Sequence, residues 1–211
     1  MLFLIAGSTG AGKTTVIKKV MQTLGHGNIA TFPSCTTRPP REGEINGKDY
    51  CFLTKEQFNE AIKIHDIVEA KKIYGNYYGT NIKVILEGLT NSYTLIKDVD
   101  VEGYKNVIKR IHYCLDKQDL APLPIVSILI DADDATLLSR MKGRNDNTNV
   151  TLREIELLKE RAIKQHNHYD YRVINTDVDT CVQKVCDIIN TEYLKNYGKP
   201  LVTTGKSQER I

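Results

Sequence analysis

Long hydrophobic runs are absent from the sequence. No apolar stretch approaches the roughly 18–20 residues that span a bilayer. The apolar start, Met1–Ala6, leads directly into a glycine-rich loop, whereas a signal peptide has a basic segment and a longer apolar core. We therefore predict a cytoplasmic protein without a membrane partner, whose first residues form a buried strand.

The sequence also lacks a regular cysteine pattern and a strong charge of either sign. Its five cysteines are odd in number and form no C-x-x-C pair, so we expect free thiols in a reducing compartment. A net charge of +3, from 29 basic and 26 acidic residues, is too small to indicate a nucleic-acid partner. It does suit an anionic small molecule. The length of 211 residues favours one compact domain that needs neither disulfides nor a structural metal.

Short apolar runs alternate with amphipathic stretches along the chain, which is typical of an α/β fold with a parallel sheet. Strands are predicted at residues 2–6, 29–34, 93–98, 125–130 and 172–175, and helices at residues 13–24, 81–89, 101–113, 134–142, 152–165 and 178–194.

Two stretches interrupt this alternation. Residues 35–80 are rich in glycine, proline, tyrosine and charge, with strand-like pieces at 50–53 and 67–73, and we interpret them as an inserted subdomain. Residues 143–151 form a polar loop with the composition of a lid. We expect a domain over residues 1–197, with its core in residues 1–34, 81–142 and 152–197, followed by a flexible tail over 198–211.

The first strand is followed by a glycine-rich loop that matches the pattern G-x-x-x-x-G-K-S/T. In such a loop, backbone N–H groups and a helix N-terminus surround phosphate oxygens. Lys13 would reach the β- and γ-phosphates, and the Thr14 hydroxyl would ligate Mg²⁺. The alternative is a glycine turn that only joins strand to helix. The loop alone indicates a nucleoside triphosphate, and its predicted contacts are Gly7, Ser8, Thr9, Gly10, Ala11, Gly12, Lys13, Thr14 and Thr15.

A second unusual segment places Arg38 and Arg41 three positions apart around two prolines. Prolines stiffen the backbone, so two guanidinium groups can be held toward one anion. Tyr50 and Tyr78 would add hydroxyl donors, and together these groups suit a phosphate monoester. The alternative is a solvated basic loop whose arginines pair with neighbouring glutamates.

The run from Thr36 to Phe52 resembles the guanylate kinase signature T-S/T-R-x-x-K/R-x-x-D/E-x-x-G/A-x-x-Y-x-F/Y without a mismatch. Residues 69–80 are similar to the family's E-x-A-x-x-x-G-N-Y-Y-G-T/S segment, although Ala70 and Lys71 depart from its common residues. Residues 98–103, 138–144 and 169–177 resemble further landmarks in family order. The resemblance implies a P-loop NTPase fold, a three-layer α/β/α architecture with a GMP-binding subdomain and a lid.

The resemblance further implies Mg²⁺-dependent transfer of the γ-phosphoryl group of ATP to GMP or dGMP by a monomer or homodimer. Glu69 would accept the N1 and N2 protons of guanine and Ser34 would donate to O6, a pairing that adenine does not satisfy. The positive field for transfer would come from Lys13, Arg38, Arg41, Arg140 and Arg144. The implied GMP contacts are Ser34, Arg38, Arg41, Tyr50, Glu69, Tyr78, Thr80, Asp98, Asp100 and Gly103.

Two assignments keep an alternative. Asp98 and Asp100 follow a predicted strand, at the edge of the sheet where ligands bind. One carboxylate would hold Mg²⁺ through water and the other would face the acceptor, unless Asp98 is only a helix N-cap. Asn175 would border the adenine or make a turn.

Three features depart from the family pattern. Lys97 replaces an apolar strand residue, Ile155 stands where an arginine is usual, with Arg153 and Arg161 nearby, and residues 110–124 are longer than typical. Two rival functions follow from related folds, a scaffolding domain that binds phosphopeptides and a kinase that acts on another phosphorylated acceptor such as a ribose phosphate. The intact P-loop argues against the first rival, and the presence of both Ser34 and Glu69 argues against the second.

Overall fold

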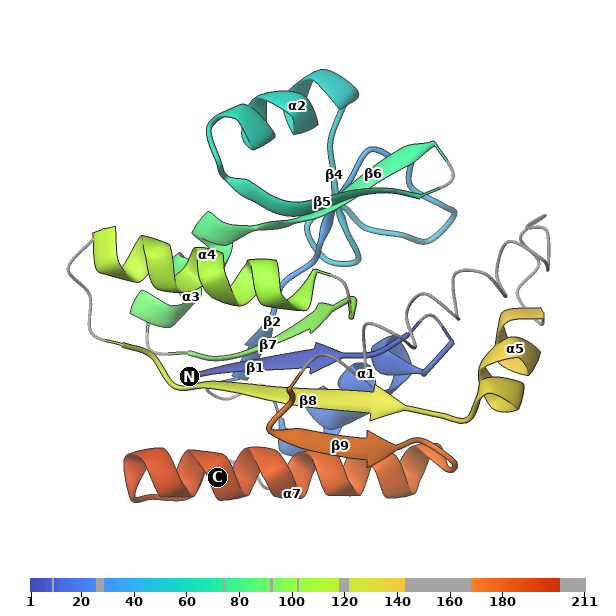
Figure 1. Cartoon of the computed structure of the whole chain (residues 1–211), viewed down its shortest axis with the longest axis vertical. Coiled ribbons are helices and arrows are strands. Elements are labelled where there is room, and N and C mark those ends of the chain that lie inside the picture. Colours follow the sequence, from blue (N-terminus) through green and yellow to red (C-terminus); the bar gives the residue numbers. More distant parts are fainter. Residues whose placement is uncertain are drawn as a thin grey trace, which may run out of the picture.

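Five parallel strands form the main sheet of the protein, in the order β2-β7-β1-β8-β9 (Figure 1). The structure is a computed structural model. It describes residues 1–8, 10–25, 29–73, 75–91, 93–101, 103–117, 122–142 and 168–201. The strands are β1 (Leu2–Ala6), β2 (Ile29–Thr31), β7 (Thr94–Val99), β8 (Ile125–Asp131) and β9 (Tyr171–Ile174).

Helices cover both faces of this sheet (Figure 1). On one face lie α1 (Lys13–Leu24) and α7 (Val178–Tyr197), and on the other lie α3 (Ile82–Thr90) and α4 (Tyr104–Lys117). A further helix, α5 (Asp134–Lys142), follows β8. The three-layer α/β/α fold with a parallel core sheet is therefore confirmed.

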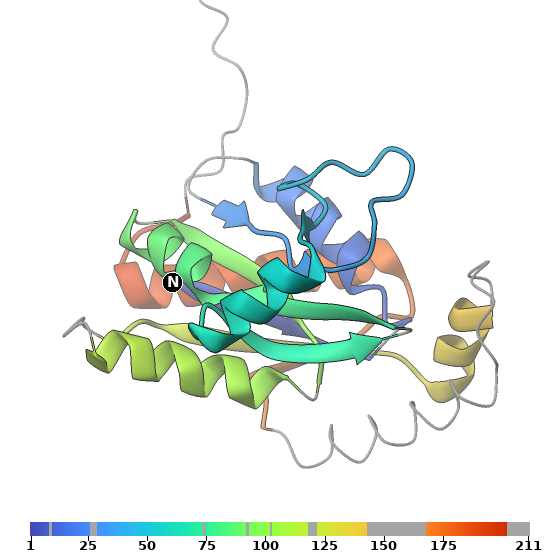
Figure 2. The same cartoon turned by 90° about the horizontal axis from the view of Figure 1, so that it is seen from above.

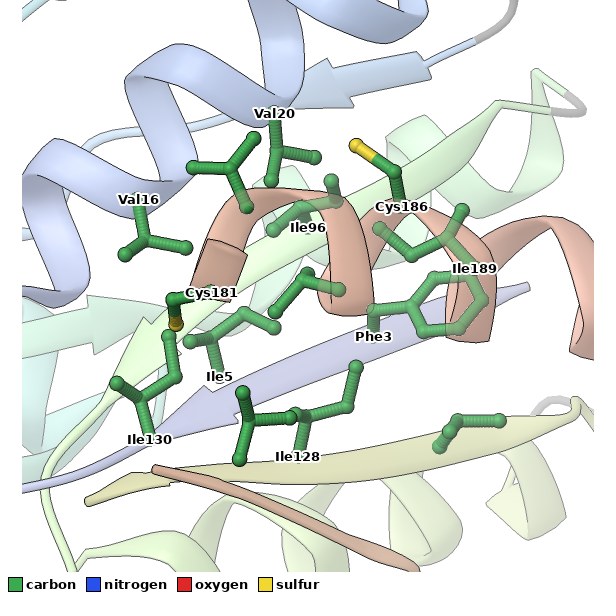
Figure 3. Packing of buried hydrophobic residues seen from close by; sticks show 14 of the residues in the cluster. Phe3, Ile5, Val16, Val20, Ile96, Ile128, Ile130, Cys181, Cys186 and Ile189 are labelled. Atoms are coloured by element: carbon green, nitrogen blue, oxygen red, sulfur yellow. The ribbon is translucent and has the colours of Figure 1, made fainter. Parts of the chain in front are cut away.

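Alternation along β1 explains why both layers form. Phe3 and Ile5 pack with α1 and α7, as Figure 3 shows, whereas Leu2 and Leu4 pack with α3 and α4. All four side chains are fully buried. A strand that is apolar on both faces is stable only when helices cover each face.

A second, smaller sheet is built from residues 35–81 in the order β4-β3-β6-β5. Its strands are β3 (Cys35–Thr36), β4 (Cys51–Phe52), β5 (Ile67–Ile73) and β6 (Asn76–Asn81). Seen from above, this sheet and α2 (Lys55–Lys63) lie over the middle of the molecule (Figure 2). The sequence patterns did not predict α2, although Thr54 and Gln57 form a capping box at its start.

Most predicted elements agree with the structure to within a few residues, and the bounds of 67–73 and 134–142 are the same. The prediction for β2 is too long, since this strand ends at Thr31, two residues before Pro33. The prediction of a helix over 101–113 is wrong at both ends, because α4 begins three residues later, at Tyr104, and ends four residues later, at Lys117. Leu201, which falls in the predicted tail, is buried in the cluster under α1 and α7.

Several predictions lie outside the described residues. They include the lid over 143–151, the helix over 152–165, residues 118–121 of the long 110–124 segment and residues 202–211 of the tail. Among the helices that the structure describes, none combines the length and the apolarity required to cross a membrane.

Candidate active site

The phosphate loop lies between β1 and α1, at the carboxyl edge of the main sheet. A tight turn joins the N–H of Ala11 to the carbonyl of Ser8 at 3.1 Å. Gly12, directly before the helix, has a φ of +90°, and a Cβ there would lie 2.6 Å from Nδ2 of Asn175. Only glycine fits both the left-handed backbone and this close approach.

Lys13 folds back over the loop. Its Nζ donates to the carbonyls of Gly7 at 2.5 Å and Ser8 at 3.2 Å. Thr14 and Thr15 are exposed in the first turn of α1. The lysine ammonium and a threonine hydroxyl therefore lie together at a helix N-terminus, whose partial positive charge favours phosphate.

Asn175 and Arg140 hold the phosphate loop in place through hydrogen bonds. The Asn175 side chain is fully buried and donates to the carbonyl of Ala11 at 2.7 Å, while its backbone N–H donates to Asp131. Arg140 in turn donates to the backbone carbonyl of Asn175 at 3.1 Å. These contacts give Asn175 a role that was not considered, since its side chain holds the phosphate loop, and its contact with the adenine stays a prediction.

At the next strand, the parallel register places the acidic residues beside the phosphate loop. Ile5 and Ala6 pair with Asp98 and Val99. Lys97, with Lys13 among the further causes, holds the pKa of Asp98 below its usual range. This juxtaposition follows from parallel pairing, because the carboxyl ends of neighbouring strands meet at one edge.

The two aspartates differ in their contacts. Asp98 does not cap a helix, because α4 begins at Tyr104 and Asp98 accepts from Lys97 at 3.1 Å. Asp100 makes the turn before α4, where its Oδ1 accepts from the N–H of Gly103 at 2.5 Å. Asp98 therefore does not have the capping role considered for it, and Asp100 holds the turn that leads into α4.

A bulge in the second sheet sets the position of Glu69. Val68 pairs with Thr80 and Lys71 with Tyr78, so β5 has one extra residue at this point. Glu69 has a φ of +51°, which is left-handed and unfavourable for a residue with a side chain. Bulges of this kind redirect a side chain and are common next to active sites. The strained backbone therefore indicates that the direction of the Glu69 carboxylate matters.

The Glu69 carboxylate has one oxygen with a hydrogen-bond partner and one without. Its Oε1 accepts from the Thr80 hydroxyl at 3.1 Å, and its Oε2 lies beside Gly103 and has no hydrogen-bond partner. Burial raises the pKa of Glu69 to about 8, and the neighbouring Asp100 and Asp98 add to this rise against the opposing effect of Lys97. The acid therefore keeps its proton near neutral pH until a donor or cation approaches.

Arg38 contacts both a glutamate and a tyrosine ring. Its guanidinium makes two hydrogen bonds of 2.9 Å to Glu44 and sits 5.3 Å from the centre of the Tyr50 ring. Tyr50 contacts Tyr78 edge to face, with 6.1 Å between ring centres. The pairing of Arg38 with Glu44 lowers the pKa of Glu44 to about 2, mainly through the hydrogen bond from Arg38. The guanidinium is thus held by a carboxylate in the geometry that a phosphate would also accept.

Buried polar atoms without a hydrogen-bond partner lie around the phosphate loop and at Glu69. Among the described residues, five buried side-chain atoms lack a hydrogen-bond partner, and four of them belong to predicted site residues. Buried polar groups are normally paired, so such atoms point to a missing ligand or water. The four atoms are Oγ of Ser8, Oε2 of Glu69, Nη1 of Arg140 and Oδ1 of Asn175.

Three predicted site residues are either exposed or outside the described residues. The Arg41 residue is exposed, and its contacts with Glu44 are made by its backbone, whose N–H donates to the carboxylate and whose carbonyl accepts from the Glu44 N–H. Thr9 and Arg144 lie outside the described residues. In the sequence Lys97 is only a departure from the family pattern, and no local pattern indicates that it contacts Ser34, which lies 63 positions away.

A parallel sheet, a glycine loop that ends in lysine and threonine, and buried polar side chains around Glu69 are together typical of a P-loop phosphotransferase. A family model described as guanylate kinase matches residues 1–192. The guanylate kinase of Wolbachia pipientis is 32% identical over 198 residues, which cover 92% of each chain. That of Streptococcus mutans is 34% identical over 196 residues, 92% of this chain and 88% of the relative.

A solved structure agrees in fold. The crystal structure of guanylate kinase from Anaplasma phagocytophilum has a TM-score of 0.64 at 23% identity and covers 91% of this chain and 85% of its own. The chain therefore belongs to the guanylate kinase family. Its activity is that of a nucleoside monophosphate kinase, a transferase for which ATP is the phosphoryl donor.

Proposed function

We propose that the protein transfers the γ-phosphoryl group of ATP to GMP or dGMP, with the base read by Glu69 and Ser34 and the acceptor phosphate held by Arg38, Arg41, Tyr50 and Tyr78. The observation that carries this proposal is Glu69 in its bulge, with one buried oxygen left without a partner. Guanine offers two adjacent donors, N1–H and N2–H, to a carboxylate. Adenine has neither the N1 proton nor the 2-amino group, so it offers the ionised Glu69 no donor along this edge.

The acceptor phosphate supplies its own nucleophile. The second pKa of a phosphate monoester is near 6, so an oxygen is already anionic at neutral pH. No general base is required, which agrees with the absence of histidine from every site motif. The residues would act by position and charge, since two polyanions have to approach in line.

Lys13, Arg140 and the start of α1 would surround the triphosphate. The residues also fit Mg²⁺ held mainly by phosphates and water. Among the described residues, no group of three His, Cys, Asp or Glu side chains could hold a metal, and Thr14 offers one exposed hydroxyl. Mg²⁺ usually keeps several waters and takes few protein ligands. When bound, it would neutralise charge on the phosphates.

A coupled assay that offers GMP, dGMP, AMP, UMP and a ribose phosphate tests the acceptor. We expect turnover with GMP and dGMP only, whereas turnover of the ribose phosphate, or none with any acceptor, would favour one of the two rival functions. Glu69→Ala should cripple GMP turnover and largely spare ATP binding. Equal loss of both would mean that the substitution disturbed the fold. Cytoplasmic location and a monomeric or homodimeric state stay predictions.

A further inference from the structure

Lys97 is a charged residue in the middle of the main sheet. It lies in β7 opposite Leu4 of β1, and its side chain is 0% exposed. Its neighbours on the same face of β7, Leu95 and Val99, belong to the apolar cluster under α3 and α4. A buried ammonium is costly unless it is paired and hydrogen-bonded. Its partners therefore indicate why a charge is kept here.

The ammonium of Lys97 has two recorded partners. It donates to Oδ1 of Asp98 at 3.1 Å and to Oγ of Ser34 at 2.5 Å. The carboxylate of Asp98 alone would neutralise the charge. The second contact reaches the hydroxyl that the proposed function assigns to the 6-keto oxygen of guanine, and it is the shorter of the two.

The hydrogen bond from Lys97 to Ser34 determines whether the Ser34 hydroxyl donates or accepts toward a ligand. An ammonium has only donors, so Ser34 Oγ accepts from Lys97, and the serine's own single proton is left for another acceptor. The Ser34 hydroxyl can then act toward a bound base only as a donor. A keto oxygen at position 6 of a purine accepts this proton, whereas an amino group at that position offers a second donor and leaves both unpaired.

We propose that Lys97 is a specificity-determining positioning residue, which fixes the Ser34 hydroxyl as a donor toward the 6-keto group of the acceptor base. This inference rests on the proposed function, in which Ser34 contacts the base. It adds a third group to the base-reading pair of Glu69 and Ser34. Lys97 acts through Ser34 and need not touch the substrate.

The test uses Lys97→Met, which keeps the length of the side chain and removes its donors. GMP and its 6-thio analogue serve as acceptors, because the analogue keeps the N1 and N2 donors and replaces the oxygen by a weak acceptor. We expect the KM for GMP to rise about tenfold, the size of one lost hydrogen bond to a charged group. The kcat and the KM for ATP should stay within twofold, and the preference for GMP over the analogue should fall.

A double-mutant cycle with Ser34→Ala separates a role through Ser34 from a general one. If Lys97 acts through Ser34, adding Lys97→Met to Ser34→Ala should leave the preference for GMP over the 6-thio analogue unchanged, because the effect of Lys97 on the pKa of Glu69 acts on both acceptors alike. Lys83→Met is the matched control, since it removes an ammonium that pairs with Asp66 at 2.7 Å outside the site. If Lys97→Met does not fold, Lys97→Gln, which can donate or accept, should give an intermediate loss of preference.

Three results would overturn the inference. If Lys97→Met keeps the KM and the GMP preference while Ser34→Ala changes both, Lys97 has no such role and the proposed function stands. If neither variant changes them, Ser34 does not read the base, and that part of the proposed function fails together with the inference. If Lys97→Met lowers kcat equally for both acceptors and raises the KM for ATP, the lysine supports the fold instead.

Discussion

Binding of GMP should become tighter as the pH rises from 6.5 toward 8.5, because Glu69 has to lose a proton before it can accept two from guanine. In the free protein, burial raises the pKa of Glu69 to about 8. Two N–H donors from the base favour the carboxylate, so the pKa is lower in the complex and binding releases a proton. At pH 7, one unit below this pKa, roughly a tenth of the molecules have the ionised acid.

The magnitude follows directly from that fraction. The apparent dissociation constant at pH 7 should be about tenfold weaker than on the high-pH plateau, which corresponds to ~1.4 kcal/mol. Isothermal titration in two buffers of different ionisation enthalpy should show release of nearly one proton per GMP at pH 7. The GMP phosphate is mostly a dianion above pH 7 and contributes little to the change.

Glu69→Gln is the control, because glutamine cannot ionise in this range and should remove the dependence on pH. The reasoning is refuted if the wild-type dissociation constant is constant between pH 7 and 8.5, or if binding takes up a proton. Stability should change in the opposite direction. An acid whose pKa is raised on folding stabilises the protein in its protonated form, and this contribution is lost as the pH rises through about 8.

Three other substitutions test the phosphate contacts. Lys13→Ala should abolish phosphoryl transfer while calorimetry shows unchanged GMP binding, and retained turnover would exclude its role. Gly12→Ala places a Cβ 2.6 Å from Asn175 at a φ of +90°, so thermal unfolding should show a loss of about 1–3 kcal/mol. Gly43→Ala, with a φ of +81° and open space around it, is its control and should lose less. Arg38→Lys keeps the charge but not the fork, and steady-state kinetics should show a KM for GMP about tenfold higher. An unchanged KM would show that the fork is not needed.

Local patterns predicted the phosphate loop well. Its glycines, Lys13 and Thr14 are contiguous, and a buried strand and an amphipathic helix flank them in both the sequence and the structure. The parallel sheet followed from the same alternation of apolar runs. These features depend on near neighbours in the chain, which a sequence displays directly.

Long-range features could not be predicted in this way. The resemblance suggested a role for Glu69, but its left-handed backbone depends on the register between β5 and β6. The contact between Lys97 and Ser34 joins residues 63 positions apart, so the lysine was recognised only as a departure. The support of the phosphate loop by Asn175 likewise requires β9 to lie at the edge of the sheet beside β8.

The left-handed backbone at position 69 means that the residue required for base recognition is not the one that gives the most stable fold. Glycine adopts a φ near +51° without penalty, and it would remove a buried acid that has one unpaired oxygen. Glu69→Gly would thus produce a more heat-resistant protein that no longer distinguishes its acceptor. A screen for heat resistance alone would therefore enrich a variant that has lost acceptor discrimination.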